Sequence, residues 1–271
     1  MKATVVVDNI KQGDIQGEWG LSIFIQDDNG KNIMLDVGGS DLFAENAKKL
    51  GIDISTADYA VLSHAHYDHS NGMACFFKEN TKAKFFLRET TEANCYGKKW
   101  IFSKYIGIPR RIMIDYSDRI EIAKGDVALY EGVTLVPHKT PGLEAIGKRE
   151  SMYRKTANGW VPDNFSHEQS LVMDTEKGMV IFNCCSHGGA ANIINEVSAT
   201  FPEKKVHAII GGFHLFNKSE REVREFAKKV KETGIEKVVT GHCTGQKAYD
   251  ILKEELGEIL QQLHVGLVLD F

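Results

Sequence analysis

The sequence lacks any long hydrophobic run, which excludes the commonest kind of membrane protein. No segment approaches the roughly 20 apolar residues that a bilayer-spanning helix needs. Near the amino terminus, Met1–Asp8 carries one basic residue and an apolar run too short for a signal peptide. We therefore expect a cytoplasmic protein with no membrane partner.

Cysteine is scarce, and no stretch of the chain is strongly basic. The five cysteines form an odd set without an even spacing, which favours reduced thiols over a disulfide framework. With 33 Lys and Arg against 37 Asp and Glu, the formal net charge is only −4. Nucleic acid is therefore not an expected partner, whereas small substrates of either sign remain open.

Length and composition are those of an ordinary globular protein. The chain has 271 residues, of which 42% are hydrophobic and 26% charged, enough to bury a sizeable core. We predict one domain spanning residues 1–271. Its first strands, Thr4–Val7, Leu21–Gln26 and Asn32–Val37, are rich in β-branched and aromatic residues and separated by turn residues. This pattern predicts an antiparallel opening.

Alternating strands and helices follow in both halves of the chain. In the second half, Ser219–Thr233 reads as an amphipathic helix in which Ser219 and Glu222 form a capping box. Two segments, Glu89–Ile114 and Gly142–Ser166, show no clear period, and we expect irregular loops there. The aromatic and basic residues of Glu89–Ile114 would suit either a pocket wall for an anionic, ring-containing ligand or a solvated cap with its own small core. For Gly142–Ser166 we expect a loop that lies across the site or at a subunit contact.

The densest polar motif is Ser63–Gly72, directly after the apolar run Tyr59–Leu62. It packs three histidines and a carboxylate into six positions. His64 and His66, two residues apart, can bind one cation, while Asp68 and His69 point elsewhere and can serve a second. The spacing therefore predicts two metal ions.

Three later strands also end at a histidine flanked by glycine. These histidines are His187, His214 and His242, in the segments Cys184–Ile194, Gly211–Leu215 and Gly241–Gly245. Strands that end in this way can bring side chains from distant parts of the sequence to one edge of a sheet. They are candidates to complete the site that Ser63–Gly72 begins.

The pattern His64-x-His66-x-Asp68-His69 resembles the metal motif of the metallo-β-lactamase fold superfamily. The three glycine-flanked segments narrow the resemblance to metal-dependent hydrolases related to dihydropterin ribofuranosylaminobenzene phosphate synthase. The resemblance covers nearly the whole chain. It implies an α/β fold, a four-layer αββα sandwich with inserted loops over the site, which also suits the order of strands and helices.

The resemblance assigns ligands to both metal sites. His64, His66 and one further histidine resemble the first site, and Asp68, His69 and His242 the second. His187 is favoured as the third histidine of the first site because it ends a core strand, with His138 and His167 as alternatives.

The chain departs from the family pattern after the strand Met179–Phe182. Most members of the superfamily place an aspartate there that bridges both metals, whereas this chain has Cys184-Cys185-Ser186-His187. Either His187 replaces the aspartate or Cys185 is a soft ligand, which would favour zinc over manganese. The other interpretation of Cys184 and Cys185 is a pair of small buried hydrophobic residues.

The resemblance implies metal-assisted hydrolysis, in which an activated water attacks a carbonyl or phosphorus centre. Asp68 would hold a metal and orient the water, and His214 would donate to the leaving group or hold a phosphate. We expect a hydrolase of a small anionic ester, with a phosphoester first, and two divalent ions, with zinc first and manganese or iron as alternatives. A transferase that couples a pterin to an arylamine phosphate, a non-catalytic metal or ligand sensor, and a homo-oligomeric state all stay open.

Overall fold

The first sheet opens with the antiparallel strands that the sequence predicts. The structure is a computed structural model and describes residues 1–271. Strands β1 (Lys2–Val7), β2 (Ser22–Gln26) and β3 (Asn32–Leu35) pair antiparallel. Parallel strands β4 (Tyr59–Val61), β5 (Lys84–Arg88) and β8 (Ile120–Ala123) extend the sheet, and β18 (Val268–Asp270) closes its other edge against β1.

The second sheet also combines antiparallel and parallel strands. Its antiparallel part is β9 (Val127–Tyr130), β10 (Val133–Pro137), β13 (Gln169–Thr175) and β14 (Gly178–Phe182). Its parallel part is β15 (Val206–Gly211), β16 (Lys237–Thr240) and β17 (Leu260–Gln262), added next to β14. The strands that precede the glycine-flanked histidines, β14, β15 and β16, are therefore direct neighbours.

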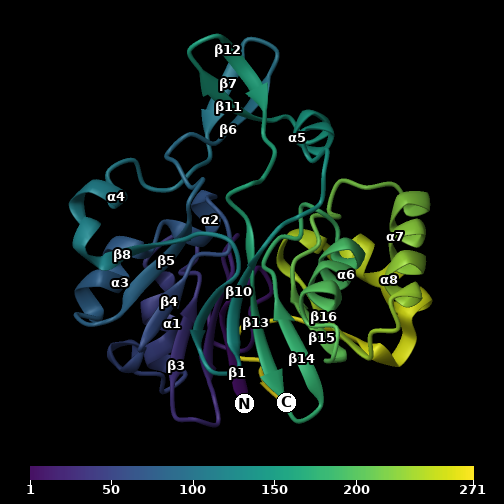
Figure 1. Cartoon of the computed structure of the whole chain (residues 1–271), viewed down its shortest axis with the longest axis horizontal. Helices are drawn as coiled ribbons and strands as arrows, with labels where there is room; N and C mark the ends of the chain where they lie inside the picture. The colour runs from purple at the N-terminus through teal and green to yellow at the C-terminus, as the bar shows by residue number, and fades with distance from the viewer.

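The two sheets pack face to face, with helices on both outer sides (Figure 1). One hydrophobic cluster lies between the sheets and includes Ile23 from β2 and Leu171 from β13. Helices α1 (Leu42–Lys49) and α3 (Met73–Glu79) cover the first sheet, and α6 (Ala190–Thr200), α7 (Glu220–Glu232) and α8 (Gln246–Leu256) cover the second. The predicted αββα sandwich is confirmed.

Short helices lie at the loops, and the predicted start of α7 is confirmed. The short α-helices are α2 (Tyr67–Ser70), α4 (Ile112–Asp115) and α5 (Glu144–Arg149), and the 3₁₀ turns are Ile54–Thr56, Ser117–Arg119, His242–Thr244 and Gly257–Ile259. At the start of α7, Ser219 accepts a hydrogen bond from the backbone of Glu222, whose side chain bonds back to the Ser219 backbone. No helix combines the length and the hydrophobicity needed to cross a bilayer.

A separate four-stranded sheet projects above the sandwich and corrects the prediction of irregular loops. It consists of β6 (Tyr96–Lys99), β7 (Phe102–Tyr105), β11 (Met152–Thr156) and β12 (Gly159–Pro162). We call residues 96–105 and 152–162 the arm. Its central pairing joins β6 to β11, and Tyr96 packs against Trp160. Local periodicity missed these strands because each has only four or five residues, and because the pairing of β6 with β11, which joins the two hairpins, links distant parts of the chain.

Candidate metal centre

The motif Ser63–Gly72 lies where β4 leaves the first sheet. His64 and His66 are on the loop after β4, and Asp68 and His69 are on the single turn of α2. All four side chains are buried. Such a concentration of buried imidazole and carboxylate groups is unfavourable unless each finds a partner or a cation.

The first group of ligand atoms surrounds His64. Nitrogens of His64 and His187 and the sulfur of Cys185 lie within 4.8 Å of one another. The His66 ring centroid is 4.6 Å from that of His64 and 5.3 Å from that of His187. The Nε2 atoms of His64 and His66 and both ring nitrogens of His187 are buried without a hydrogen-bond partner. These unpartnered nitrogens are available to a metal ion.

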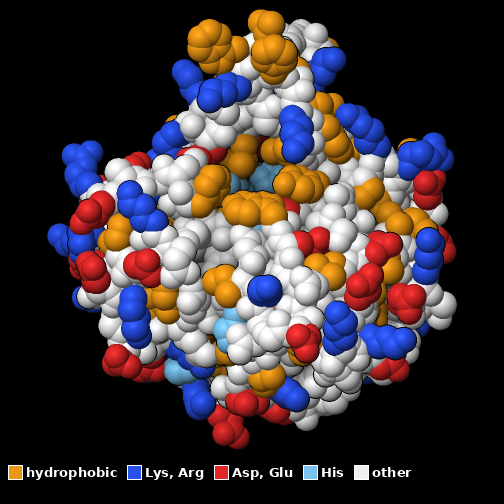
Figure 2. Space-filling model, turned by 180° about the vertical axis from the view of Figure 1, so that it is seen from behind, with side chains coloured by type: hydrophobic (Ala, Val, Ile, Leu, Met, Phe, Trp, Pro, Cys, Tyr) orange, Lys and Arg blue, Asp and Glu red, His pale blue; other side chains and the backbone are white.

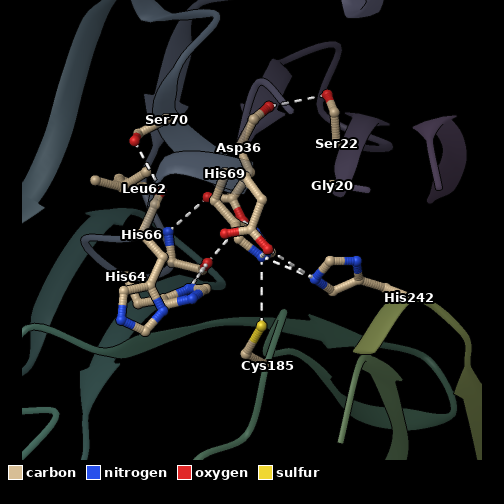
Figure 3. Close-up of polar contacts among 12 residues, drawn as sticks. Gly20, Ser22, Asp36, Leu62, His64, His66, His69, Ser70, Cys185 and His242 are labelled. Atoms are coloured by element: carbon tan, nitrogen blue, oxygen red, sulfur yellow. Dashed lines mark hydrogen bonds and ion pairs between the residues drawn. The ribbon is translucent and has the colours of Figure 1, made fainter. Parts of the chain in front are cut away.

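The second group joins α2 to the end of β16 (Figure 3). The Nε2 atoms of His69 and His242 are 3.1 Å apart, and Asp68 Oδ2 is 3.9 Å from the first and 3.6 Å from the second. Two nitrogens bound to one tetrahedral zinc ion lie about 3.3 Å apart. The spacing therefore suits a shared cation.

Cys185 belongs to both groups. Its sulfur is 3.3 Å from His69 Nε2 and also lies within the His64 and His187 group. In Figure 3 this sulfur points toward His69 from the loop after β14. The sequence left Cys185 and His187 as candidates to replace the bridging aspartate. Cys185 lies between the two groups, whereas His187 belongs only to the group of His64.

A single carboxylate, Asp36, supports one histidine from each group. His69 Nδ1 lies 2.7 Å from Asp36 Oδ2, and the Ser63 hydroxyl donates to the same oxygen at 2.6 Å. The Ser63 oxygen is in turn 2.9 Å from His64 Nδ1. These contacts place the Nδ1 protons away from the site and leave both Nε2 atoms facing it, the orientation that supporting residues impose on metal-binding histidines.

His242 is held in the same way by residues that follow β1. Its Nδ1 is 3.1 Å from Asn9 Oδ1, and its backbone N–H donates to Asp8 at 2.9 Å. With both Nδ1 protons used, the Nε2 lone pairs of His69 and His242 face each other. Such an arrangement requires a positive charge between them, either a proton or a metal ion.

The histidine pKa values reflect this need for a cation. Burial lowers the pKa of His66 and of His242 to about 3, and lowers those of His64 and His187 well below the usual range. For His69 the effect of burial is outweighed by Asp36 and Asp68, which raise its pKa to about 9. Neutral imidazoles are the form that binds metals.

His187 is fixed by an aromatic ring and by its backbone. Its ring stacks on Phe165 at a centroid distance of 4.2 Å, and its N–H donates to Glu168 at 3.3 Å. Glu168 is itself paired with His138, whose Nε2 lies 2.8 Å from Glu168 Oε1. The atoms are close but not aligned as a hydrogen bond, so the contact is an ion pair. His138 is therefore engaged beside the loop of His187.

His167 lies beside His66 in a buried cluster with Cys95 and Asp163. Its Nδ1 accepts a hydrogen bond from the backbone N–H of Ala65 at 3.1 Å, so Nε2 carries the proton of the neutral ring. That proton faces Asp163 at 3.3 Å and Cys95 at 3.6 Å. A protonated Nε2 cannot bind a metal. The structure thus places His167 as a support for the backbone between His64 and His66.

His214 lies at the edge of the site. Its ring centroid is 4.6 Å from that of His187, and its Nε2 is 3.7 Å from Glu150 Oε2. The side chain keeps 13% of its surface exposed, in contrast to the buried ligand candidates. His214 can therefore contact a bound molecule.

Several residues in the loops that carry the candidate ligands have a strained backbone. Seven residues other than glycine have a positive φ, and four of them are Asp36 (55°), Ser186 (50°), His214 (49°) and His242 (45°). Each follows the end of a strand and lies in or beside the two ligand groups. Left-handed backbone at such residues persists only where the surroundings hold it, and it concentrates at functional sites.

The opening of the site is lined by aromatic side chains. Trp19 and Phe216 are 43% and 50% exposed, and their rings contact each other edge to face. The ring centroid of Trp19 lies 5.2 Å from that of His242, and the ring centroid of Phe216 lies 5.1 Å from that of His214. Figure 2 shows a hollow below the arm with histidine side chains at its base and hydrophobic side chains around it. The centre is therefore reachable from solvent.

Comparison with known proteins agrees with this arrangement. Residues 20–151 match the sequence model of the metallo-β-lactamase superfamily. A solved structure described as Tm1679, a metal-dependent hydrolase of the β-lactamase superfamily, superposes with a TM-score of 0.85 at 27% identity, covering 100% of this chain and 99% of the other. The chain has the metallo-β-lactamase fold. The predicted resemblance to that superfamily is confirmed. The fold implies divalent metal binding, and the clusters of His, Cys and Asp side chains are consistent with it.

A curated relative comes from the branch that the sequence resembles. It is the 7,8-dihydropterin-6-methyl-4-(beta-D-ribofuranosyl)-aminobenzene-5'-phosphate synthase of Methanocaldococcus jannaschii, 29% identical over 93% of this chain and 90% of the relative. Zn(2+)-bound PqqB from Methylobacterium extorquens shares the fold alone, with a TM-score of 0.59 at 10% identity over 100% of both chains.

Several supporting residues were not assigned a role from the sequence. Asp36 was visible as a carboxylate before Gly38 and Gly39 at a strand end, a signal similar to that of the histidine motif. Asp8, Asn9 and Glu168 gave no such signal, because their contacts cross between parts of the chain that are far apart in sequence.

Proposed function

We propose that the protein is a binuclear, zinc-dependent hydrolase of a small anionic ester. The observation that carries the proposal is the pair of adjoining ligand groups with Cys185 between them. Buried nitrogens without a hydrogen-bond partner, together with a soft sulfur, form a donor set that suits zinc better than manganese.

Each ion would be held by histidines from distant parts of the sequence. His64, His66 and His187 would hold the first ion, and Asp68, His69 and His242 the second, with Cys185 between them. When bound, such ions supply Lewis-acid chemistry, which polarises the substrate and makes water a stronger nucleophile at neutral pH. Burial raises the pKa of the Cys185 thiol, so the sulfur needs that positive charge to act as a thiolate.

Asp68 and His214 would carry the remaining steps. Asp68 keeps about 10% of its side chain exposed, so one oxygen can bind an ion while the other accepts a hydrogen bond from the attacking water. His214 would donate a proton from Nε2 to the leaving group, and Glu150 Oε2, 3.7 Å away, would help to orient the ring. An oxygen leaving group would depart with that proton.

The substrate class follows from the charges near the opening. A cavity of about 100 Å³ beside His187 and His214 is also lined by Arg149 and Lys218, which pair with Glu150 at its wall. It adjoins a second cavity of about 280 Å³ that shares both cations. A phosphoester could exchange one of these ion pairs for its own negative charge.

A second candidate function is the coupling of a pterin to an arylamine phosphate. The name of the Methanocaldococcus jannaschii relative favours it, as does the aromatic opening formed by Trp19 and Phe216. Flat rings pack well against exposed aromatic side chains. The same cavities could then hold the phosphate of the arylamine.

Product analysis separates the two candidates. The protein would be reconstituted with zinc, manganese or iron and offered a panel of phosphomonoesters and phosphodiesters, and separately a pterin pyrophosphate with an arylamine phosphate. We expect ester cleavage that is highest with zinc. Coupling without cleavage of any ester would contradict the hydrolase proposal and support the second candidate.

Substitutions in the metal centre test whether it is required for turnover. His66→Ala and Asp68→Asn should each abolish turnover and lower the zinc content measured by elemental analysis. His207→Ala is the matched control, since His207 pairs with Glu236 on the surface, away from the site. Full turnover in His66→Ala would refute the assignment. A protein that binds zinc but turns over nothing, and whose partner binding depends on a ligand, would instead be a sensor.

A further inference from the structure

The end of the arm exposes three consecutive large hydrophobic side chains. Trp100, Ile101 and Phe102, here called the tip, are 85%, 89% and 75% exposed at the turn between β6 and β7. Figure 2 shows hydrophobic side chains at the far end of this projection. Contiguous exposed hydrophobic residues with polar neighbours usually mark a binding surface.

All the charged residues of the arm are also cationic. Residues 96–105 and 152–162 contain Lys98, Lys99, Lys104, Arg154 and Lys155 and no Asp or Glu, a net charge of +5 in a chain whose total is −4. The remainder of the chain therefore carries −9. None of the four lysines is ion-paired with a carboxylate within the chain. Lys99 and Lys155 are the exposed ones nearest the turns of the two hairpins. The partner of the tip should be acidic around a hydrophobic centre.

The body of the same chain has a surface of that kind. A groove of about 610 Å³, here called the groove, has a hydrophobic floor formed by Ala44, Ile52 and Ile54. Its rim carries the carboxylates Glu45, Asp53 and Glu79 and a single cation, Lys48. None of the three carboxylates is ion-paired within the chain. The groove thus matches the tip in both hydrophobic character and charge.

The tip and the groove cannot meet within one molecule. The groove lies along α1 and α3 on the lower left flank in Figure 1, whereas the arm projects at the top. We propose that the tip of one copy of this chain docks in the groove of a second copy. If a twofold axis relates the copies, each supplies one tip and one groove, and the contact forms twice and closes. Forming it twice also helps to reach the roughly 1,000 Å² that a specific interface buries.

Other acidic partners explain only half of these observations. An anionic bilayer or a nucleic acid would attract the lysines, and either would accept an exposed tryptophan. Neither accounts for a groove with unpaired carboxylates on the same chain. A second copy uses both surfaces, so we favour it.

Sedimentation of the full-length, metal-loaded protein tests the proposal. We expect a dimer whose dissociation constant rises with salt, because the contact joins opposite charges. Trp100→Ser should raise that constant by at least about thirtyfold, as for a tryptophan at the centre of an interface. Ile114→Ser is the matched control, because Ile114 is 67% exposed on α4, outside both tip and groove, and should leave the dimer intact.

Charge reversal tests the pairing itself. Lys99→Glu with Lys155→Glu should weaken the dimer, as should Glu45→Lys with Glu79→Lys, and the four changes together should restore it. A monomer at every concentration would overturn the proposal, as would a dimer unaffected by Trp100→Ser, or a failure of the combined variant to reassociate although circular dichroism shows it folded. Tip-dependent binding to anionic vesicles or RNA by a monomeric protein would also overturn it.

Discussion

The buried pair of His138 and Glu168 allows a quantitative prediction. Both side chains are almost completely buried, at 3% and 0% exposure, and their facing atoms are 2.8 Å apart. Glu168 also accepts the backbone N–H of His187. Glu168→Gln keeps the size of the side chain and removes its charge, so it leaves His138 in a buried site without its main counter-ion.

The magnitude follows from the pKa of His138. Burial alone would lower it, but Glu168 and Glu196 more than offset burial and raise it from 6.5 to about 9. At 1.36 kcal/mol per pKa unit, the protonated ring stabilises the fold by about 3 kcal/mol. Because the pKa is raised in the folded state, this contribution is complete below pH 6.5 and is lost as the pH rises through 9.

Urea unfolding at a series of pH values measures this contribution. With saturating metal and fixed ionic strength, we expect Glu168→Gln to lower the free energy of unfolding by about 3 kcal/mol at pH 6.5. The difference should shrink as the pH approaches 9. Glu203→Gln, at an exposed glutamate with no ion pair, is the control and should change little at any pH. A difference that stays constant across this range would refute the reasoning, because it would not come from the charge of His138.

Two further substitutions probe the support of the centre and the packing beneath it. Asp36→Asn should weaken zinc binding about 10- to 100-fold in a chelator competition. The reason is that the Asp36 carboxylate orients His69 directly and His64 through Ser63. Unchanged zinc affinity would show that Asp36 does not orient these histidines. Gly72→Ala should lower the free energy of unfolding by about 3 kcal/mol, since a Cβ there would lie 2.3 Å from the Val37 carbonyl oxygen; an unchanged melting temperature would contradict this.

Local sequence signals were enough to predict the layers of the fold and most candidate ligands. The histidines of Ser63–Gly72, His187 and His242 each follow an apolar strand, and parallel strands β4, β14 and β16 end beside the site. Periodicity identifies such strands, and the polar residues directly after them are therefore visible from the sequence. The spacing alone could not show which side chains meet, because that depends on how the two sheets pack.

The arm and the supporting contacts were not predictable in this way. Strands β6 and β11 are each short, and they are stabilised by pairing with each other across a long sequence separation. Likewise, the role of Asp163 appears only once its contact with His167 and that of His167 with Ala65 are known. Contacts of this kind leave no period in either segment, so no window of sequence contains them.

Placing a sulfur between the two ligand groups changes what the proposed centre can do. A carboxylate can bind two ions through two hard oxygens and therefore suits manganese, whereas the thiolate of Cys185 offers one soft atom and favours zinc. That sulfur also has a second cysteine beside it, because Cys243 Sγ lies 3.5 Å away, within hydrogen-bond distance. A thiol that donates a hydrogen bond to a thiolate draws electron density from its sulfur. With Cys185 bound to the ions as a thiolate, a hydrogen bond from Cys243 would therefore weaken its hold on them. In the proposed centre, the choice of metal would then depend on two cysteines that follow the ends of β14 and β16, as well as on the histidine motif that first indicates the site.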